Sequence, residues 1–453
     1  EPDTVCTTVG CDTDDCTCTR NPTCADTDGS GMAYSSGLCV AAGMLRRFDW
    51  ATAPVCAGSC DTVDCCVASV SNGVLTNQVN LIDPTNLYAV TVVTVSPDGK
   101  NVYAVAEGSD SIVYWDRDSA TGALSNQVNL IDSTNLDAVF SVVVSPDGKN
   151  VYATGYSSDS IVYWDRDSTT GALTNQVDLI DSANFNSPRY LTVSPDGKNV
   201  YAAAQVSDSI VYWERDTATG ALTNQVNLKD STNLDGAFGV AVSPDGKYVY
   251  AAAVTSDSIV YWRRDTATGA LTNQVNFEDS TNLDGVNNVF VSPDGKNVYV
   301  TAYASDSLVY WDRDSTTGAL TNQVNLIDSV NLDLAYSVVV SPDGKNVYAV
   351  AGTSDSIVYW DRDSATGALT NQVNLIDSTN LDGVYNVIVS PDGKNVYAVG
   401  KSSRSVVYWD RSSIDTCSIF SCDAGYSVAN PDTVCTTVGC EASDCTCVPD
   451  RTC

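Results

Sequence analysis

The sequence contains no histidine among its 453 residues. Histidine is the usual general base at neutral pH, a frequent zinc ligand and the partner of serine or cysteine in nucleophilic pairs, so these arrangements are excluded. No apolar run is long enough to predict a membrane-spanning helix. Basic residues are scarce, because 23 lysines and arginines face 56 aspartates and glutamates, which leaves a net charge of -33. This balance excludes binding to nucleic acid through its phosphates and unaided binding to an anionic membrane surface, and without a long apolar run we expect no membrane insertion.

Cysteine is missing from the middle of the chain and concentrated at its two ends. Of the 17 cysteines, ten precede residue 67 and seven follow residue 416. Five at one end have the same spacing as five at the other: Cys6, Cys11, Cys16, Cys18 and Cys24 match Cys435, Cys440, Cys445, Cys447 and Cys453. Segments rich in cysteine and poor in apolar residues need disulfides to hold a shape. The alternative, a thiolate metal site, lacks both a CxxC pair and histidine.

These ends predict an extracellular location, secreted or on the cell surface, where disulfides persist. The chain begins at Glu1, which we interpret as a processed form or an excerpt. Because the cysteine count is odd, at least one cysteine is free or bonded to another chain. We therefore expect end-to-end self-association, and a duplicated stalk module with one unpaired thiol is the alternative. The stretch from Cys417 through Cys422 to Tyr426 resembles EGF-like modules.

One short acidic stretch suggests a metal. Asp26 and Asp28, in the sequence DTDGSG, look like half of a calcium loop, but the closing glutamate is missing. We expect no required cofactor and name Ca²⁺ as the one metal that the sequence suggests.

Seven copies of a 49-residue unit fill the centre of the chain, each reading SPDGKNVYA and then SDSIVYWDRDSATGALTNQVNLIDS with small changes. The apolar residues of a copy alternate with a period of two, in short runs rich in β-branched and aromatic residues. Turn residues such as Pro146, Asp147 and Gly148 separate the runs. Four strands per copy indicate one blade of a β-propeller, and seven copies indicate seven blades.

The ends of the repeat region predict how the ring closes. An outer-strand sequence at residues 74–81 precedes the first inner strand, whereas the last copy stops after Trp409, Asp410 and Arg411. The first segment therefore supplies the missing strand of the last blade, which removes exposed sheet edges. The expected domains are a Cys-rich module at 1–66, an all-β seven-bladed propeller at 67–414 and a Cys-rich EGF-like module at 415–453.

The repeat resembles the lactonase-like propeller family, which includes 6-phosphogluconolactonase and surface-layer propellers. The shared features are the VSPDGKNVYV-type hairpin and the turn from Asp116, Arg117 and Asp118 to Leu124, and the resemblance covers residues 70–412. It implies the propeller fold. It also implies, for the hydrolases of the family, a histidine or a cluster of ionic side chains in the central funnel. Since this chain has no histidine, the resemblance transfers no catalytic residue.

The charges of one repeat divide between the two ends of its strands. In the turns that hold Asp98, Lys100 and residues 116–118, the positive and negative charges nearly balance. The opposite loops carry carboxylates without a counter-ion in the same copy: Glu107, Asp110, Asp132 and Asp137. We expect one acidic face and one near-neutral face studded with lysines, a polarity that favours head-to-tail stacking and suits Ca²⁺. The alternative is that each aspartate caps its own turn.

The copies differ mainly at the expected mouth of the central channel. Aromatic rings beside Asp and Asn are typical of carbohydrate contact, and ordinary filling of the mouth is the alternative. The candidate ligand-binding residues are Tyr88, Phe140, Tyr156, Arg189, Tyr190, Phe238, Tyr303, Tyr336 and Tyr385. The position before the next bend varies as well, reading Glu107, Tyr156, Gln205, Val254, Tyr303, Gly352 and Lys401. Arg189, which follows Pro188, marks the most unusual copy.

These features together predict a protein that is not an enzyme. Loops repeated almost verbatim offer seven equivalent shallow sites, whereas an enzyme needs one asymmetric site. We expect an extracellular structural protein, a subunit of a fibre, appendage or coat that assembles end to end through its Cys-rich ends and propeller faces. A carbohydrate-binding or adhesion propeller is the first alternative, with glycans as partners, and a lactonase-like hydrolase is the second.

Overall fold

The computed structural model describes residues 37–41, 44–48, 73–412, 426–428 and 447–449. Within these ranges the protein is built from β-strands, with a single short 3-10 turn, η2 (Glu107–Ser109). No helix among them has the length and apolarity needed to span a membrane.

The chain divides into a unit of Glu1–Val70 and a unit of Ser71–Cys453. In the first unit, β1 (Gly37–Ala41) and β2 (Met44–Phe48) form an antiparallel pair. The second unit holds seven four-stranded antiparallel sheets and a further antiparallel pair, β31 (Tyr426–Val428) with β32 (Cys447–Pro449).

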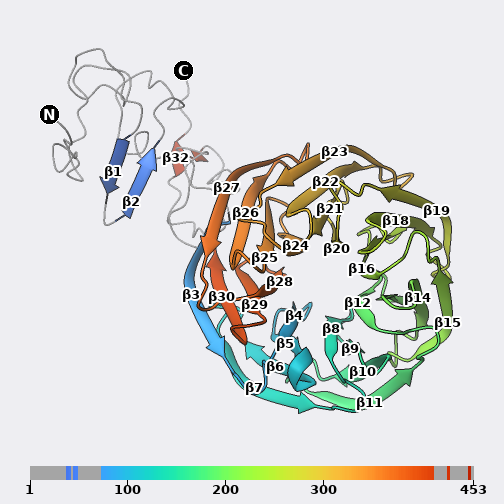
Figure 1. Ribbon diagram of the computed structural model, residues 1–453. Helices are drawn as coiled ribbons and strands as arrows, with labels where there is room; N and C mark the ends of the chain where they lie inside the picture. Colours follow the sequence, from blue (N-terminus) through green and yellow to red (C-terminus); the bar gives the residue numbers. More distant parts are fainter. Residues whose placement is uncertain (1–36, 42–43, 49–72, 413–425, 429–446, 450–453) are drawn as a thin grey trace, which may run out of the picture. The chain divides into compact units, whose positions relative to one another are not determined.

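Each repeat forms one blade of a seven-bladed β-propeller (Figure 1). Blade 1 pairs β4 (Val90–Val95), β5 (Asn101–Ala106), β6 (Ser111–Arg117) and β7 (Leu124–Ile131) in that order. Blades 2 to 4 are β8 (Val139–Val144), β9 (Asn150–Gly155), β10 (Ser160–Arg166), β11 (Leu173–Ile180); β12 (Pro188–Val193), β13 (Asn199–Ala204), β14 (Ser209–Arg215), β15 (Leu222–Lys229); and β16 (Ala237–Val242), β17 (Tyr248–Ala253), β18 (Ser258–Arg264), β19 (Leu271–Glu278). Blades 5 to 7 are β20 (Val286–Val291), β21 (Asn297–Ala302), β22 (Ser307–Arg313), β23 (Leu320–Ile327); β24 (Ala335–Val340), β25 (Asn346–Ala351), β26 (Ser356–Arg362), β27 (Leu369–Ile376); and β28 (Val384–Val389), β29 (Asn395–Gly400), β30 (Ser405–Arg411) with β3 (Leu75–Ile82).

Burial changes across each blade in the way that a propeller requires. All six residues of β5 are buried, because this strand is covered on both faces by the neighbouring blades. The outermost strand β7 exposes most of its side chains and is rich in Asn, Gln and Ser. The core consists of side chains packed between adjacent sheets, with Tyr103 and Trp115 almost completely buried. The predicted four-stranded blades are therefore confirmed.

The ring closes as predicted. The strand β3, from before the first blade, pairs antiparallel with β30 of the last blade, with Leu81 opposite Val406 and Leu75 opposite Arg411. In Figure 1 the blue β3 lies beside the red β30. The sheet order β28-β29-β30-β3 therefore joins the start of the propeller to its end.

Buried arginines join each blade to the preceding one. Arg166, at the end of β10, donates from Nε to Tyr103 Oη (2.9 Å) and from Nη1 to Gly148 O (2.9 Å). Its Nη2 contacts Asp98 Oδ1 (3.0 Å) and Asn101 Oδ1 (2.6 Å), both in blade 1. The side chain of Arg166 is fully inaccessible to solvent. One cation thus satisfies four groups in two blades.

The same ion pair recurs at every blade junction, at 2.8–3.2 Å: Arg117–Asp392, Arg166–Asp98, Arg215–Asp147, Arg264–Asp196, Arg313–Asp245, Arg362–Asp294 and Arg411–Asp343. Burial of Asp98 favours its neutral form, but hydrogen bonds from Ser96 and Lys100 and the Arg166 charge outweigh burial and lower its pKa. Each aspartate of an SPDG turn is thus neutralised by the next blade, not by its own. This explains the near-neutral face that the charge pattern predicts.

The predictions for the two ends fall largely outside the described residues. These include the calcium ligands Asp26 and Asp28 and the EGF-like stretch from Cys417 to Cys422. Of the ten cysteines with matching spacing, only Cys447 belongs to a described strand, β32.

Candidate functional site

The mouth of the central channel is formed by one irregular position in every inner strand. In β8, Val139 pairs with Gly155 and Ser141 with Thr154, so Phe140 between them has no partner in the ladder. Such a bulge turns a side chain away from its normal direction. The equivalent residues, one per blade, are Thr91, Phe140, Arg189, Phe238, Asn287, Tyr336 and Tyr385. Six of the seven positions are thus set by the same one-residue bulge, whereas in β12 both Arg189 and Tyr190 lie outside the ladder.

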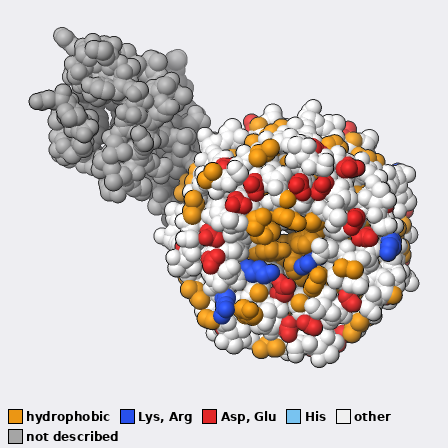
Figure 2. All heavy atoms as spheres, in the orientation of Figure 1, with side chains coloured by type: hydrophobic (Ala, Val, Ile, Leu, Met, Phe, Trp, Pro, Cys, Tyr) orange, Lys and Arg blue, Asp and Glu red, His pale blue; other side chains and the backbone are white. Residues whose placement is uncertain are grey.

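Aromatic rings from both adjacent and non-adjacent blades meet at this mouth. The ring centroid of Phe140 lies 5.5 Å from that of Tyr190, 5.5 Å from that of Phe238 and 5.9 Å from that of Tyr385, all edge to face. Tyr336 stacks on Tyr385 with the centroids 4.6 Å apart. Figure 2 shows hydrophobic side chains gathered around the central opening of one face, with a few basic side chains beside them and carboxylates spread outside. The channel therefore has an aromatic floor.

Arg189 lies over this floor. Its guanidinium carbon is 3.9 Å from the ring centroid of Tyr156, 4.6 Å from that of Phe140 and 5.0 Å from that of Phe238. Its Nε donates to Gln205 Oε1 at 2.7 Å. No carboxylate of the described residues forms an ion pair with it, in contrast to the buried arginines at the blade junctions. The aromatic faces and one amide hold a cation that lacks a counter-ion.

A second charged pair reaches the same floor from two other blades. Lys401 Nζ, from blade 7, is 2.7 Å from Glu107 Oε2 of blade 1 and 5.3 Å from the ring centroid of Tyr385. Burial, together with the neighbouring Tyr190, raises the pKa of Tyr385 well above its ordinary value, although the charge of Arg189 acts in the opposite direction. Arg189 lies over Phe140, whose ring packs against Tyr385, and Lys401 lies over Tyr385, so both cations border one aromatic cluster.

The structure brings most of the candidate ligand-binding residues together. Phe140, Tyr156, Arg189, Tyr190, Phe238, Tyr336 and Tyr385 belong to one connected group, and Tyr303 extends it through Tyr336, with the two ring centroids 6.2 Å apart. Tyr88 is the exception. It occupies the repeat position of Asp137, is 47% exposed and packs under the Arg404 guanidinium. Blade 1 instead contributes Thr91 to the ring of inner-strand residues, where sequence reasoning had placed Tyr88.

The mouth is asymmetric, which corrects the prediction of seven equivalent shallow sites. A different combination of side chains stands at each blade, and Glu107, Arg189 and Lys401 come from blades 1, 3 and 7. The strands, turns and junction residues of the blades repeat almost unchanged, whereas the residues that line the channel differ from blade to blade. Glu107, Gln205 and Lys401 complete the site, and their signal in the sequence was variation at a single repeat position.

The loops around the mouth carry the predicted excess of carboxylates, and hydrogen bonds accommodate many of them. Asp230 accepts from Asn233 and Gln274, and these bonds outweigh the effect of burial, so its pKa falls to about 2. The pKa of Asp355 rises instead, first through burial and then through the charge of Asp382. In the part of the chain that the structure describes, no three His, Cys, Asp or Glu side chains come together.

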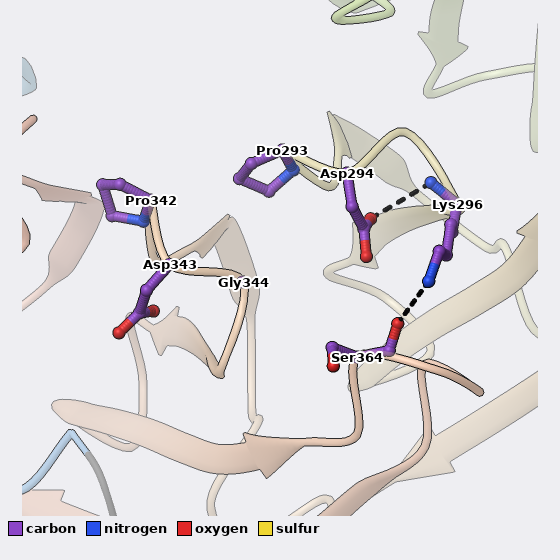
Figure 3. A pocket seen from close by; sticks show the side chains of 7 residues that line it. All are labelled: Pro293, Asp294, Lys296, Pro342, Asp343, Gly344 and Ser364. Atoms are coloured by element: carbon purple, nitrogen blue, oxygen red, sulfur yellow. Dashed lines mark hydrogen bonds between the residues drawn. The ribbon is translucent and has the colours of Figure 1, made fainter. Parts of the chain in front are cut away.

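The opposite face holds a shallow hollow of about 390 Å³ between blades 5 and 6, lined by Pro293, Asp294, Lys296, Pro342, Asp343, Gly344 and Ser364 (Figure 3). Its charged groups already have partners. Lys296 Nζ donates to Ser364 O at 2.8 Å, and the two aspartates pair with Arg362 and Arg411. The mouth, where Arg189 has no counter-ion, is therefore the better candidate site.

Solved structures confirm the fold. A protein provisionally named 6-phosphogluconolactonase from Bacteroides uniformis is 21% identical, with a TM-score of 0.54 over 71% of this chain and 92% of its own. A second protein of the same provisional name, from Bacteroides fragilis, is 21% identical, with a TM-score of 0.51 over 63% and 84%. Hydrazine synthase of Kuenenia stuttgartiensis is 20% identical, with a TM-score of 0.55 over 77% and 99%. The comparison with curated proteins finds no match.

The sequence matches the family described as "Lactonase, 7-bladed beta-propeller" over residues 93–234 and 228–332, which together span more than half of the chain. This match overturns the prediction that the protein is not an enzyme, because it points to a hydrolase family, as do the names of two similar structures. The absence of histidine excludes one class of catalytic group but not catalysis by other ionic side chains. The chain belongs to the lactonase family of seven-bladed β-propellers.

Proposed function

We propose that the protein hydrolyses the lactone of an acidic sugar at the mouth of its channel. The observation that carries this proposal is the convergence of Arg189 and the Glu107–Lys401 pair, from three blades, on one aromatic floor. A guanidinium without a counter-ion matches an anionic substituent on the substrate. The aromatic rings match the apolar face of a sugar ring, and the family match supplies the reaction class.

The chemistry needs a base, a group that stabilises negative charge and a proton donor. Glu107 accepts from Lys401 through Oε2 only, which leaves Oε1 to accept a proton from a water molecule. The water oxygen then bonds to the lactone carbonyl carbon, and the positive charge of Lys401 stabilises the oxyanion that forms. The ring C–O bond breaks, and the leaving oxygen takes the proton held by Glu107. Arg189 binds the substrate and holds it over the rings.

The test is hydrolysis of a panel of sugar-acid lactones by the full chain, with neutral lactones alongside. We expect Glu107→Gln to lower kcat by about 10²–10⁴-fold with little change in KM, and Arg189→Ala to raise KM for the acidic lactones selectively. The control variant Val330→Thr replaces an exposed residue with the one found in other repeats and should leave both constants unchanged. Hydrolysis no faster than the uncatalysed rate, or full activity of the Glu107 variant, would reject the proposal.

We also propose that the protein acts outside the cell and associates end to end through its cysteine-rich ends. The odd number of cysteines and the matched spacing at the two ends support this. Electron microscopy and gel electrophoresis of native material, each with and without reductant, provide the test. Repeating both with a chelator tests the calcium proposed for Asp26 and Asp28. Single separate particles under every condition would reject the assembly.

A further inference from the structure

Blade 4 departs from the repeat at two paired positions on its outer side. Six blades carry Asn at the position of Tyr248 and an acidic residue at that of Arg263. In blade 4 these two residues are direct cross-strand partners, Tyr248 on β17 and Arg263 on β18. Both members of one cross-strand pair, one buried and one exposed, are therefore replaced together in blade 4.

The unmodified blades show what this contact does. In blade 1, Asp116 accepts from Asn101 Nδ2 at 3.2 Å and from Asn126 Nδ2 at 2.7 Å. In the other five blades with an acidic residue here, the equivalent of Asn126 also donates to it, at 2.7–2.8 Å: Asn77 to Asp410, Asn175 to Asp165, Asn224 to Glu214, Asn322 to Asp312 and Asn371 to Asp361. The carboxylate at this position is a constant acceptor on the outer surface of the ring.

In blade 4 the carboxylate is missing and its donor remains. Asn273, the equivalent of Asn126, keeps the same left-handed backbone, with φ of 55°, and lines the same hollow as Arg263, which stands where the other blades carry an acid. Arg263 is exposed, and no acidic side chain of the described residues forms an ion pair with it. Two groups of donors thus lie together where the other blades place an acceptor.

These groups line a hollow of about 280 Å³ between blade 4 and the loop of blade 5: Tyr248, Tyr261, Arg263, Asn273, Val275, Thr316 and Thr317. Tyr248 bridges the two blades, because its hydroxyl donates to Thr316 O. Its ring also lies 5.3 Å from the Arg313 guanidinium carbon and so fills the place of the lost Asn. The hollow is therefore built on a fixed aromatic wall with exposed threonine hydroxyls at its edge.

We propose that this hollow binds an acidic sugar through its carboxylate. The carboxylate takes the place of the missing acidic side chain, accepting from Asn273 Nδ2 and from the Arg263 guanidinium, whose two parallel N–H groups match both oxygens. The threonine hydroxyls and the apolar surface of Val275 then contact the sugar hydroxyls and ring. The chain is strongly acidic overall and repels anions in general. Arg263, exposed between Asn273 and Tyr248, provides a local positive charge that attracts the carboxylate.

The test is titration calorimetry of the full chain with glucuronate, and with glucose as the neutral control. The reference protein carries Arg189→Ala, so that binding at the channel mouth does not contribute. We expect glucuronate to bind the reference protein, and Arg263→Asp, which restores the acidic residue and its bond to Asn273, to weaken binding by about tenfold or more. Because six blades already contain that pair, this variant is expected to fold.

A second variant separates charge from geometry. Arg263→Lys keeps the charge but loses the two parallel donors, so we expect an intermediate affinity. Equal binding of glucuronate by the reference protein and by Arg263→Asp would overturn the proposal. So would equal binding of glucose and glucuronate, or the absence of glucuronate binding at millimolar concentration. Loss of lactone hydrolysis is not a readout here, so this test stands apart from that of the channel mouth.

Discussion

The two faces of the propeller use the same repeat in opposite ways. On the face of the SPDG turns, all seven junctions carry the same arginine–aspartate pair at nearly the same distance. On the mouth face, the seven equivalent inner-strand positions carry side chains as different as Thr91, Arg189 and Asn287. The comparison teaches that constancy in a repeat marks the contacts that hold the ring, whereas variation marks the residues free to acquire a ligand.

Low pH should weaken the Arg–Asp ion pairs at all seven blade junctions at the same time. The aspartates of the SPDG turns have lowered pKa values in the folded protein, as Asp98 and Asp343 show. Their contribution to stability is therefore complete above the unfolded-state pKa of about 4 and is lost as the pH falls through the lower folded-state pKa. We expect the midpoint of urea unfolding, followed by tryptophan fluorescence, to fall steeply as the pH drops below about 4. A midpoint that stays constant over this interval would contradict the role given to these pairs.

One junction can be broken alone with Arg166→Ala. This change leaves Asp98, Asn101 and the Tyr103 hydroxyl without their buried donor, so we expect a loss of about 3–5 kcal/mol in the free energy of unfolding. Arg313→Ala should cost roughly 1 kcal/mol less, because blade 4 has no Asn to leave unpaired.

The exposed Arg263→Ala provides the control for these two changes and should alter the free energy of unfolding by less than about 0.5 kcal/mol. Urea denaturation of all three variants measures the order. Equal losses for Arg166→Ala and Arg263→Ala would show that the buried network does not stabilise the ring.

The mouth face should tolerate change at little cost in stability. We expect Arg189→Met to lower the free energy of unfolding by no more than about 1–2 kcal/mol, the value of its contacts with the rings of Tyr156, Phe140 and Phe238. The same variant should lose its preference for acidic lactones. Thermal unfolding and hydrolysis measured on one preparation check both. If Arg189→Met destabilised the protein as much as Arg166→Ala, the distinction between the faces would not hold.

Much of the fold could be predicted because each level of the sequence points to the same answer. Alternating apolar residues predict the strands, the SPDG and TG turns predict where the strands end, and the unfinished last copy predicts the pairing of β3 with β30. These signals are local or periodic. The ion-pair partner of Arg166 is harder to predict from the sequence. Each copy contains both an Arg and an Asp, and the partner, Asp98, lies in another copy.

The candidate site was predicted in part, for a similar reason. Variable positions identified Arg189, Tyr156 and Tyr385. The 49-residue spacing aligns Thr91, and not Tyr88, with Phe140, so the choice of Tyr88 followed its residue type and not its repeat position. The pairing of Glu107 with Lys401 joins residues 294 positions apart in the sequence and required the closed ring. The absence of histidine does not exclude an enzyme, since it concerns only one kind of catalytic group.

Because β3 pairs with β30, the ring cannot close during synthesis until β30 has been translated. The two strands are separated by more than 300 residues, so at ordinary rates of translation β30 emerges roughly 15–65 s after β3. Throughout that interval the nascent chain carries an outer strand without its sheet. Its Thr76, Asn77 and Gln78 are polar, which hinders premature pairing with neighbouring chains on the same message.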